Sequence, residues 1–285
     1  MPMLQHSFVH LPGIGLKTER SLWEKGICTW KFFSDEDGWC RAPFSRRKCE
    51  VLRERLEICR EKLWALDAAY FAHCLGPQFL WRLFADFREC AAFLDIETTG
   101  LCGPNDHITT AALYDGKQVF HYIYGENLDL FVQDLRKYKV LITYNGACFD
   151  LPFIRNYFRT AVDHVHIDLR YLLANLGYRG GLKGCERGLG LDRGGLNGVD
   201  GWFAVLLWRE YRNTGNIKAL ETLLAYNTAD TVNLENLMVQ GFNMKLAETP
   251  FQELRIPLPC PPAIPFKPDP ELIEELRGGW AASQD

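Results

Sequence analysis

Residues 91–100 read AAFLDIETTG and carry the strongest structural signal in the chain. Apolar residues occupy both faces of this run, which is typical of a strand inside a sheet. Asp95 and Glu97 nevertheless share one face, because side chains two positions apart in a strand point the same way. Phe93 lies on that face too, so an acidic edge strand facing water is the less favoured alternative. Two buried like charges need a counter-ion, and a divalent cation with oxygen ligands is the simplest one.

A second acidic candidate follows a later predicted strand, in residues 144–152, YNGACFDLP. Asn145 ends that strand, and Asp150 stands where a helix is expected to begin. Asp is also a favoured residue at helix N-termini, so Asp150 taken alone could be a helix cap and nothing more.

The third candidate lies in the helix predicted over residues 217–239, where polar residues interrupt an apolar stripe. Asn227, Asp230 and Thr231 occupy the middle of the stripe. An acidic residue on a core-facing stripe is costly unless something compensates its charge. Tyr226 precedes Asp230 by four residues, so the two side chains lie one helical turn apart.

Together these segments supply four carboxylates on three separate elements: Asp95, Glu97, Asp150 and Asp230. Their natural joint use is to hold two divalent metal ions about 3.5–4 Å apart for in-line attack on phosphorus. One ion would lower the pKa of the attacking water, and the other would stabilise the leaving oxygen. Tyr226 could orient that water or help to remove its proton.

Strand-like and helical patterns dominate from residue 91 onward, and Asp115-Gly116 is a hairpin signal between two of the strands. This order predicts an α/β fold, with a mixed five-stranded sheet flanked by helices. The expected strands are 91–98, 107–114, 117–124, 139–144 and 165–168. The expected helices are 127–137, 151–158, 169–176, 182–189, 202–213 and 217–239.

The chain is expected to have three regions, namely a mostly helical extension over 1–90, a sheet domain over 91–245 and a tail over 246–285. Eight prolines fall between Pro250 and Pro270. Because proline lacks a backbone donor, we expect an extended tail with little hydrogen-bonded structure.

The order of the three motifs, Asp-x-Glu, Asn-x-x-x-Phe-Asp and Tyr-x-x-x-Asp, resembles the DEDD superfamily of 3′–5′ exonucleases, in the DEDDy subgroup. The resemblance covers about residues 91–240, and the wider chain resembles bacterial YprB-like proteins, which are predicted exonucleases with a helical N-terminal extension. It implies an RNase H-like fold for this region. It further implies that the four carboxylates are metal ligands and that Tyr226 positions the water.

Two further residues are candidate nucleic-acid contacts. Asn145 belongs to the second motif, and Lys183 lies in the segment LKGCE at 182–186, which resembles a segment of the same proteins. Lys183 could contact a phosphate, although a solvated lysine at a helix start is at least as good an interpretation.

The N-terminal residues 11–15, LPGIG, resemble the hairpin of a helix-hairpin-helix motif. In such a turn, backbone N–H groups near Gly13 and Gly15 would approach a phosphate. The alternative is a plain helical turn whose glycines allow tight packing. Glu19 stands where those motifs commonly have a small residue, and its charge would not favour DNA.

Composition limits the other possibilities. The net charge of −4 lacks the overall basic character that many nucleic-acid binders show. An enzyme could still hold a polyanion through metal ions and a local basic patch. The ten cysteines show neither C-x-x-C pairs nor zinc spacing. We interpret them as small core residues of a protein in a reducing compartment, not as a disulfide framework. With neither a signal peptide nor a long apolar run, we expect a cytoplasmic protein without a membrane partner.

The leading hypothesis is a metal-dependent 3′–5′ exonuclease that uses two Mg²⁺ or Mn²⁺ ions on DNA or RNA, with a single-stranded 3′ end preferred. One alternative is a nucleic-acid-binding module that keeps the fold but has little catalysis. Another is an RNase H-like endonuclease. The preference for a 3′ end rests on the resemblance of the Tyr-x-x-x-Asp motif, and the choice between DNA and RNA stays open.

Overall fold

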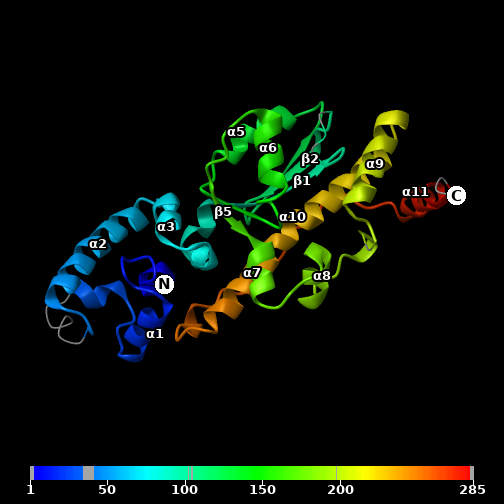
Figure 1. Cartoon of the computed structure of the whole chain (residues 1–285). Coiled ribbons are helices and arrows are strands. Elements are labelled where there is room, and N and C mark those ends of the chain that lie inside the picture. Colours follow the sequence, from blue (N-terminus) through cyan, green and yellow to red (C-terminus); the bar gives the residue numbers. More distant parts are fainter. Residues whose placement is uncertain (1–2, 35–41, 102, 104, 197, 283–285) are drawn as a thin grey trace. The chain divides into compact units, whose positions relative to one another are not determined.

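The computed structural model describes residues 3–34, 42–101, 103, 105–196 and 198–282 (Figure 1). The chain divides into two compact units. Unit 1 contains residues 1–91 and 241–257, and unit 2 contains residues 92–240 and 258–285.

Unit 1 is helical and is organised around a buried ion pair. Glu19 and Arg82 are almost inaccessible to solvent, and two nitrogens of the guanidinium contact the carboxylate at 2.7 and 2.8 Å. Large aromatic side chains such as Phe8, Trp30 and Phe71 fill the surrounding core. The helices of this unit are η1 Met3–His6, α1 Leu16–Glu24, η2 Trp30–Ser34, α2 Arg46–Trp64, α3 Ala68–Cys74, η4 Pro77–Leu83, α4 Phe84–Phe87, η5 Arg88–Cys90 and η8 Gln252–Leu254.

Unit 2 is built on a five-stranded sheet with the order β3-β2-β1-β4-β5. The first three strands pair antiparallel and β4 pairs with β5 in parallel, so the sheet is mixed as predicted. The strand boundaries lie within about two residues of the expected ones. They are β1 Ala91–Thr98, β2 Ile108–Tyr114, β3 Val119–Ile123, β4 Val140–Thr143 and β5 Val165–Asp168.

Helices cover both faces of this sheet (Figure 1). On one face, Leu94 and Ile96 of β1 share a core with Phe131 of α5 (Phe131–Leu135) and Ile154 of α6 (Asp150–Phe158). On the other face, α10 (Ile217–Leu246) contacts the sheet through hydrogen bonds such as that between the Tyr114 hydroxyl and Glu235. The acidic face of β1 is therefore the face beneath α10. The remaining helices of the unit are η6 Leu128–Leu130, α7 Leu169–Asn175, α8 Gly181–Gly188, η7 Gly194–Leu196, α9 Gly201–Thr214 and α11 Pro270–Ala282.

The C-terminal region corrects one prediction. The extended tail reaches only to Asp269, because α11 begins at Pro270, a favoured residue for the first turn of a helix. Leu272 and Ile273 of this helix are buried in the same apolar cluster as residues of α9 and α10. The backbone N of Asp269 also donates to the Thr222 hydroxyl at 3.0 Å, so this part of the tail is packed within unit 2.

The part of the chain that the structure describes contains no helix long and apolar enough to cross a bilayer. No disulfide links the cysteines within it.

Candidate active site

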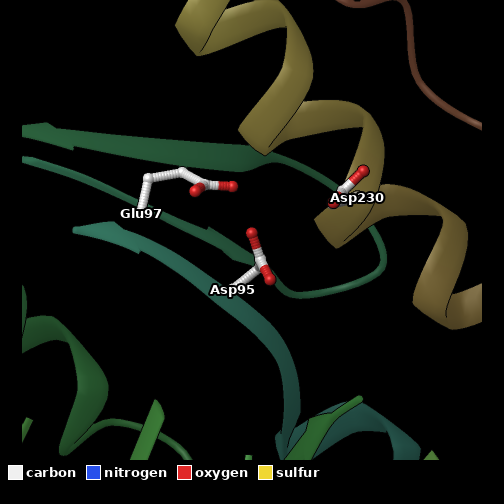
Figure 2. A group of neighbouring side chains, drawn as sticks. All are labelled: Asp95, Glu97 and Asp230. Carbon is white, nitrogen blue, oxygen red and sulfur yellow. The ribbon is translucent and has the colours of Figure 1, made fainter. Parts of the chain in front are cut away.

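Three carboxylates converge on the face of the sheet beneath α10. Asp95 and Glu97 project from β1, and Asp230 comes from the helix (Figure 2). One oxygen of each carboxylate lies within 4.8 Å of the other two. The regular pairing of β1 with β2 breaks between Glu97 and Thr98, an irregularity of the kind found beside functional sites. Oxygen atoms at this spacing can surround a divalent cation.

Asp150 approaches from a third element as the first residue of α6. Its Oδ1 accepts a hydrogen bond from the backbone N of Ile96 at 3.2 Å, so the carboxylate lies against β1. The helix cap interpretation does not describe this side chain, because Phe149 holds the N-cap position. Asp150 is outside the group of three converging oxygens. It nevertheless lines the same cleft of about 610 Å³ as the other three carboxylates.

Burial and mutual repulsion hold these carboxyl groups toward their protonated forms. Burial, with the charges of Asp230 and Asp150, raises the pKa of Asp95 well above its usual value. Burial and the neighbouring Asp95 do the same to the pKa of Glu97. Burial raises the pKa of Asp150 to about 7, and that of Asp230 to about 6, where Arg193 opposes the rise. A bound cation would reverse this situation, because it favours the ionised carboxylates.

Tyr226 lines the cleft one turn before Asp230. Burial raises its pKa far above the usual value, and the carboxylates of Asp230 and Glu97 add to the rise. The phenol therefore keeps its proton in the metal-free protein. Two cations lie near the ring, with Lys183 Nζ at 5.2 Å and Arg193 Cζ at 5.7 Å from the centroid.

Asn145 lies in the loop between β4 and α6 and lines the cleft. Its φ of 66° is in the left-handed region, which asparagine tolerates better than most residues. Asp168, at the end of β5, holds this loop by accepting hydrogen bonds from the backbone N of Asn145 and of Ala147. Arg170 donates to the Asn145 side-chain oxygen at 2.5 Å. The side chain of Asn145 is thus held in place at the cleft.

Lys183 lies on α8, and its ammonium group donates to the carbonyl of Val199. The residue is half-buried, and burial lowers its pKa. Lys183 is therefore partly withdrawn from solvent near the start of its helix. Its neighbours Gly181 and Leu182 line the cleft, and a contact between Lys183 and a phosphate stays a prediction.

Gly13 and Gly15 lie on an exposed turn of unit 1, immediately before α1. Gly13 has a φ of 69°, which glycine adopts without strain. Glu19 is fully buried and accepts a hydrogen bond from the backbone N of Phe8 at 2.6 Å. Its charge is neutralised by Arg82 inside the unit, so the objection that this charge opposes DNA loses its force. Phosphate binding at the turn stays a prediction.

Two neighbours of the carboxylates, Asn227 and Arg193, had no predicted role. Asn227 donates to Asp95 Oδ2 at 2.7 Å and to the Asp95 backbone oxygen at 3.2 Å. Its position in the interrupted stripe was a signal that could have identified it. Arg193, with Nη1 2.5 Å from Asp230 Oδ1, lies in a loop without periodicity, so no pattern pointed to it.

The donor set fits a hard divalent cation. Asp95, Glu97 and Asp230 offer oxygen ligands alone, and oxygen sets suit Mg²⁺, Mn²⁺ or Ca²⁺ better than softer metals. Burial and mutual repulsion raise the pKa values of these carboxyl groups, and a bound cation would offset both effects.

The chain belongs to the RNase_H superfamily, whose sequence profile matches residues 92–241, just over half of its length. This membership and the observed sheet confirm the predicted RNase H-like fold. Among solved structures, the chain is similar to the family B DNA polymerase from the hyperthermophilic archaeon Pyrobaculum calidifontis, at 14% sequence identity and a TM-score of 0.42. That similarity covers 55% of this chain and 24% of the polymerase, so the match spans about a quarter of that protein's length. No curated protein matches the chain.

Proposed function

We propose that this protein is a metal-dependent nuclease that removes nucleotides from the 3′ end of DNA or RNA. The observation that carries the proposal is the presence of four carboxylates from three elements, together with Tyr226, in the lining of one cleft. Membership of the RNase_H superfamily supports an activity on nucleic acid. The assignment to the DEDDy type, and with it the preference for a 3′ end, rests on the resemblance of the three motifs.

Asp95, Glu97 and Asp230 would hold one divalent ion, and Asp150 would contribute to the binding of a second. When bound, Mg²⁺ or Mn²⁺ ions supply an activated water nucleophile and stabilise charge on the leaving oxygen. Asn227 keeps Asp95 oriented toward the cleft through its hydrogen bond to Oδ2. Tyr226 lines the cleft one turn before Asp230, and its hydroxyl can donate a hydrogen bond to the attacking water.

Other side chains that line the cleft are suited to bind a single strand of nucleic acid. Exposed Arg170 and Arg179 carry the positive charge that the phosphate backbone attracts. The aromatic rings of Tyr144, Phe149 and Tyr178 offer surfaces for stacking, and unpaired bases stack on such rings whatever their sequence. A base within a duplex cannot reach such a ring without leaving its stack. We therefore propose a single-stranded 3′ end as the substrate.

The test uses a 5′-labelled single-stranded oligonucleotide, as DNA and as RNA, incubated with the protein and Mn²⁺ or Mg²⁺. The wild type should shorten the strand stepwise, and a chemically blocked 3′ end should stop it. Asp95→Asn should lower the rate about a thousand-fold or more, since the lost ligand removes roughly 4 kcal/mol of barrier stabilisation. Asp129→Asn, the same change at an exposed position of unit 2, should leave the rate unchanged.

Three results would redirect or reject the proposal. Internal cuts in an RNA–DNA hybrid, without stepwise shortening, would favour the endonuclease. Binding without degradation of any substrate would favour a nucleic-acid-binding module. Undiminished activity of Asp95→Asn, with circular dichroism showing an intact fold, would reject the carboxylate site itself.

A further inference from the structure

Arg193 is a buried cation that links two acidic residues beside the cleft. Only 5% of its side chain is exposed. Its Nε donates to Glu186 Oε2 at 2.5 Å, and its Nη1 lies 2.5 Å from Asp230 Oδ1. Burying an arginine in this way costs free energy unless its partners are fixed, so the arrangement calls for an explanation.

Glu186 is held in turn by a second contact. Its other oxygen, Oε1, accepts a hydrogen bond from Asn233 Nδ2 at 2.8 Å. Both oxygens of Glu186 are thus engaged, and the carboxylate cannot swing toward the cleft without losing them. The chain of contacts runs from Asn233 on α10 through Glu186 on α8 to Arg193, and returns to α10 at Asp230.

Two roles for such an arginine make opposite predictions. It could act as a substitute cation that occupies the position of a metal ion and must leave before the ion binds. Alternatively, it could hold Asp230 in the orientation that the ion requires. A substitute cation should lie among the converging oxygens. Within the described residues, however, the ion pairs of Arg193 are with Glu186 and Asp230, and not with Asp95 or Glu97.

The guanidinium also contacts the residue one turn earlier on α10. Its Cζ lies over the Tyr226 ring, 5.7 Å from the centroid. A single tethered group therefore touches both Tyr226 and Asp230. This geometry suits orientation of that segment of the helix better than occupation of a metal position.

We propose that Arg193 is a positioning residue that fixes Asp230 for metal binding, with Glu186 and Asn233 as its anchor. This inference rests on the proposed function, because it assumes that Asp230 is a metal ligand. Groups that hydrogen-bond to metal ligands orient them, and removing such a group typically weakens metal binding 10–100-fold.

The experiment measures Mn²⁺ binding to the full chain by isothermal titration calorimetry, without nucleic acid. Arg193→Gln should weaken the binding of Mn²⁺ about 10–100-fold. Arg187→Gln, which removes the same charge from an exposed position on α8, should bind as the wild type does. Equal or tighter binding by folded Arg193→Gln would overturn the inference, and tighter binding would identify a substitute cation. If the wild type binds no Mn²⁺, the proposed function fails instead.

A double-mutant cycle separates positioning from a general effect on the fold. If Arg193 acts through Asp230, Arg193→Gln should have no further effect on Mn²⁺ binding in an Asp230→Asn background. A full additional loss there would contradict the inference. Arg193→Gln leaves Glu186 buried and unpaired and could unfold the chain, so the variant Glu186→Gln/Arg193→Gln removes both charges together. This variant should fold and still bind Mn²⁺ more weakly than the wild type, and wild-type affinity would again overturn the inference.

Discussion

Two groups of buried carboxyl side chains, Glu19 in unit 1 and the cluster of Asp95, Glu97 and Asp230 in unit 2, are compensated in opposite ways. In unit 1, Glu19 meets Arg82 in a two-point ion pair and also accepts the backbone N–H of Phe8. In unit 2, Asp95 and Glu97 face another carboxylate, that of Asp230, with one oxygen of each within 4.8 Å. The first cluster is neutral within the chain. The second is neutral only if protons or an external cation bind.

The contrast separates a structural charge from a functional one. A paired charge with fixed donors can hold a fold together, and removing one partner leaves the other buried and uncompensated. A cluster of like charges weakens the fold that carries it, so its presence calls for a ligand that restores the balance. Neutralising a carboxylate by mutation should therefore lower the stability of the fold in the first cluster and raise it in the second.

The largest effect is expected in unit 1. Glu19→Gln removes the charge that compensates Arg82, and the free energy of unfolding should fall by about 3–5 kcal/mol. Urea denaturation followed by circular dichroism measures this change. Glu24→Gln, on the exposed side of the same helix, should change stability by no more than about 0.5 kcal/mol. A similarly small change for Glu19→Gln would remove the distinction between the two clusters.

The sheet and the acidic positions were predictable because both depend on local patterns. Alternation along residues 91–98 places Asp95 and Glu97 on one face, and the interrupted stripe around Asp230 marks its helix as unusual. That these residues converge on one site could be predicted only from the fold. The expected RNase H-like sheet brings β1 and α10 together across more than a hundred residues of chain.

What escaped prediction depends on partners distant in the sequence. Arg193 lies in a loop rich in glycine, and its role becomes visible only when α8 and α10 lie beside it. Glu19 was interpreted as a charge unfavourable to DNA because its partner Arg82 is 63 residues away. Likewise, the prolines that precede α11 led us to expect extended structure there. Leu272 and Ile273 are nevertheless the apolar residues that pack this helix within unit 2.

A mutation of Asn227 tests whether its hydrogen bond orients Asp95, and the expected effect is smaller. Asn227→Ala removes the donor to Asp95 Oδ2, and Mn²⁺ binding should weaken about 10–100-fold. That range corresponds to about 1.4–2.7 kcal/mol. Asn175→Ala, at the exposed end of α7, is the matched control. Unchanged Mn²⁺ binding by Asn227→Ala would mean that the strand alone orients Asp95.

The smallest expected effect is an increase in stability, and it depends on pH. The raised pKa values mean that the folded metal-free protein binds protons more tightly than the unfolded chain does. The contribution of these carboxyl groups to stability should therefore be full below about pH 4 and should fall as the pH rises toward about 7, the pKa of Asp150. Asp95→Asn removes one of the repelling charges, so at pH 8 it should stabilise the metal-free protein by about 0.5–2 kcal/mol.

Thermal unfolding at pH 4 and pH 8, in the presence of a chelator, measures this gain. The advantage of Asp95→Asn should disappear at pH 4, where the raised pKa values keep the buried carboxyl groups of the cleft largely protonated in both proteins. It should also disappear at pH 8 with saturating Mn²⁺, which stabilises only a chain that retains its ligands. A loss of stability at pH 8 in the chelator would mean that Asp95 is compensated within the chain, as Glu19 is. Glu19 and Asp95 would then be compensated alike.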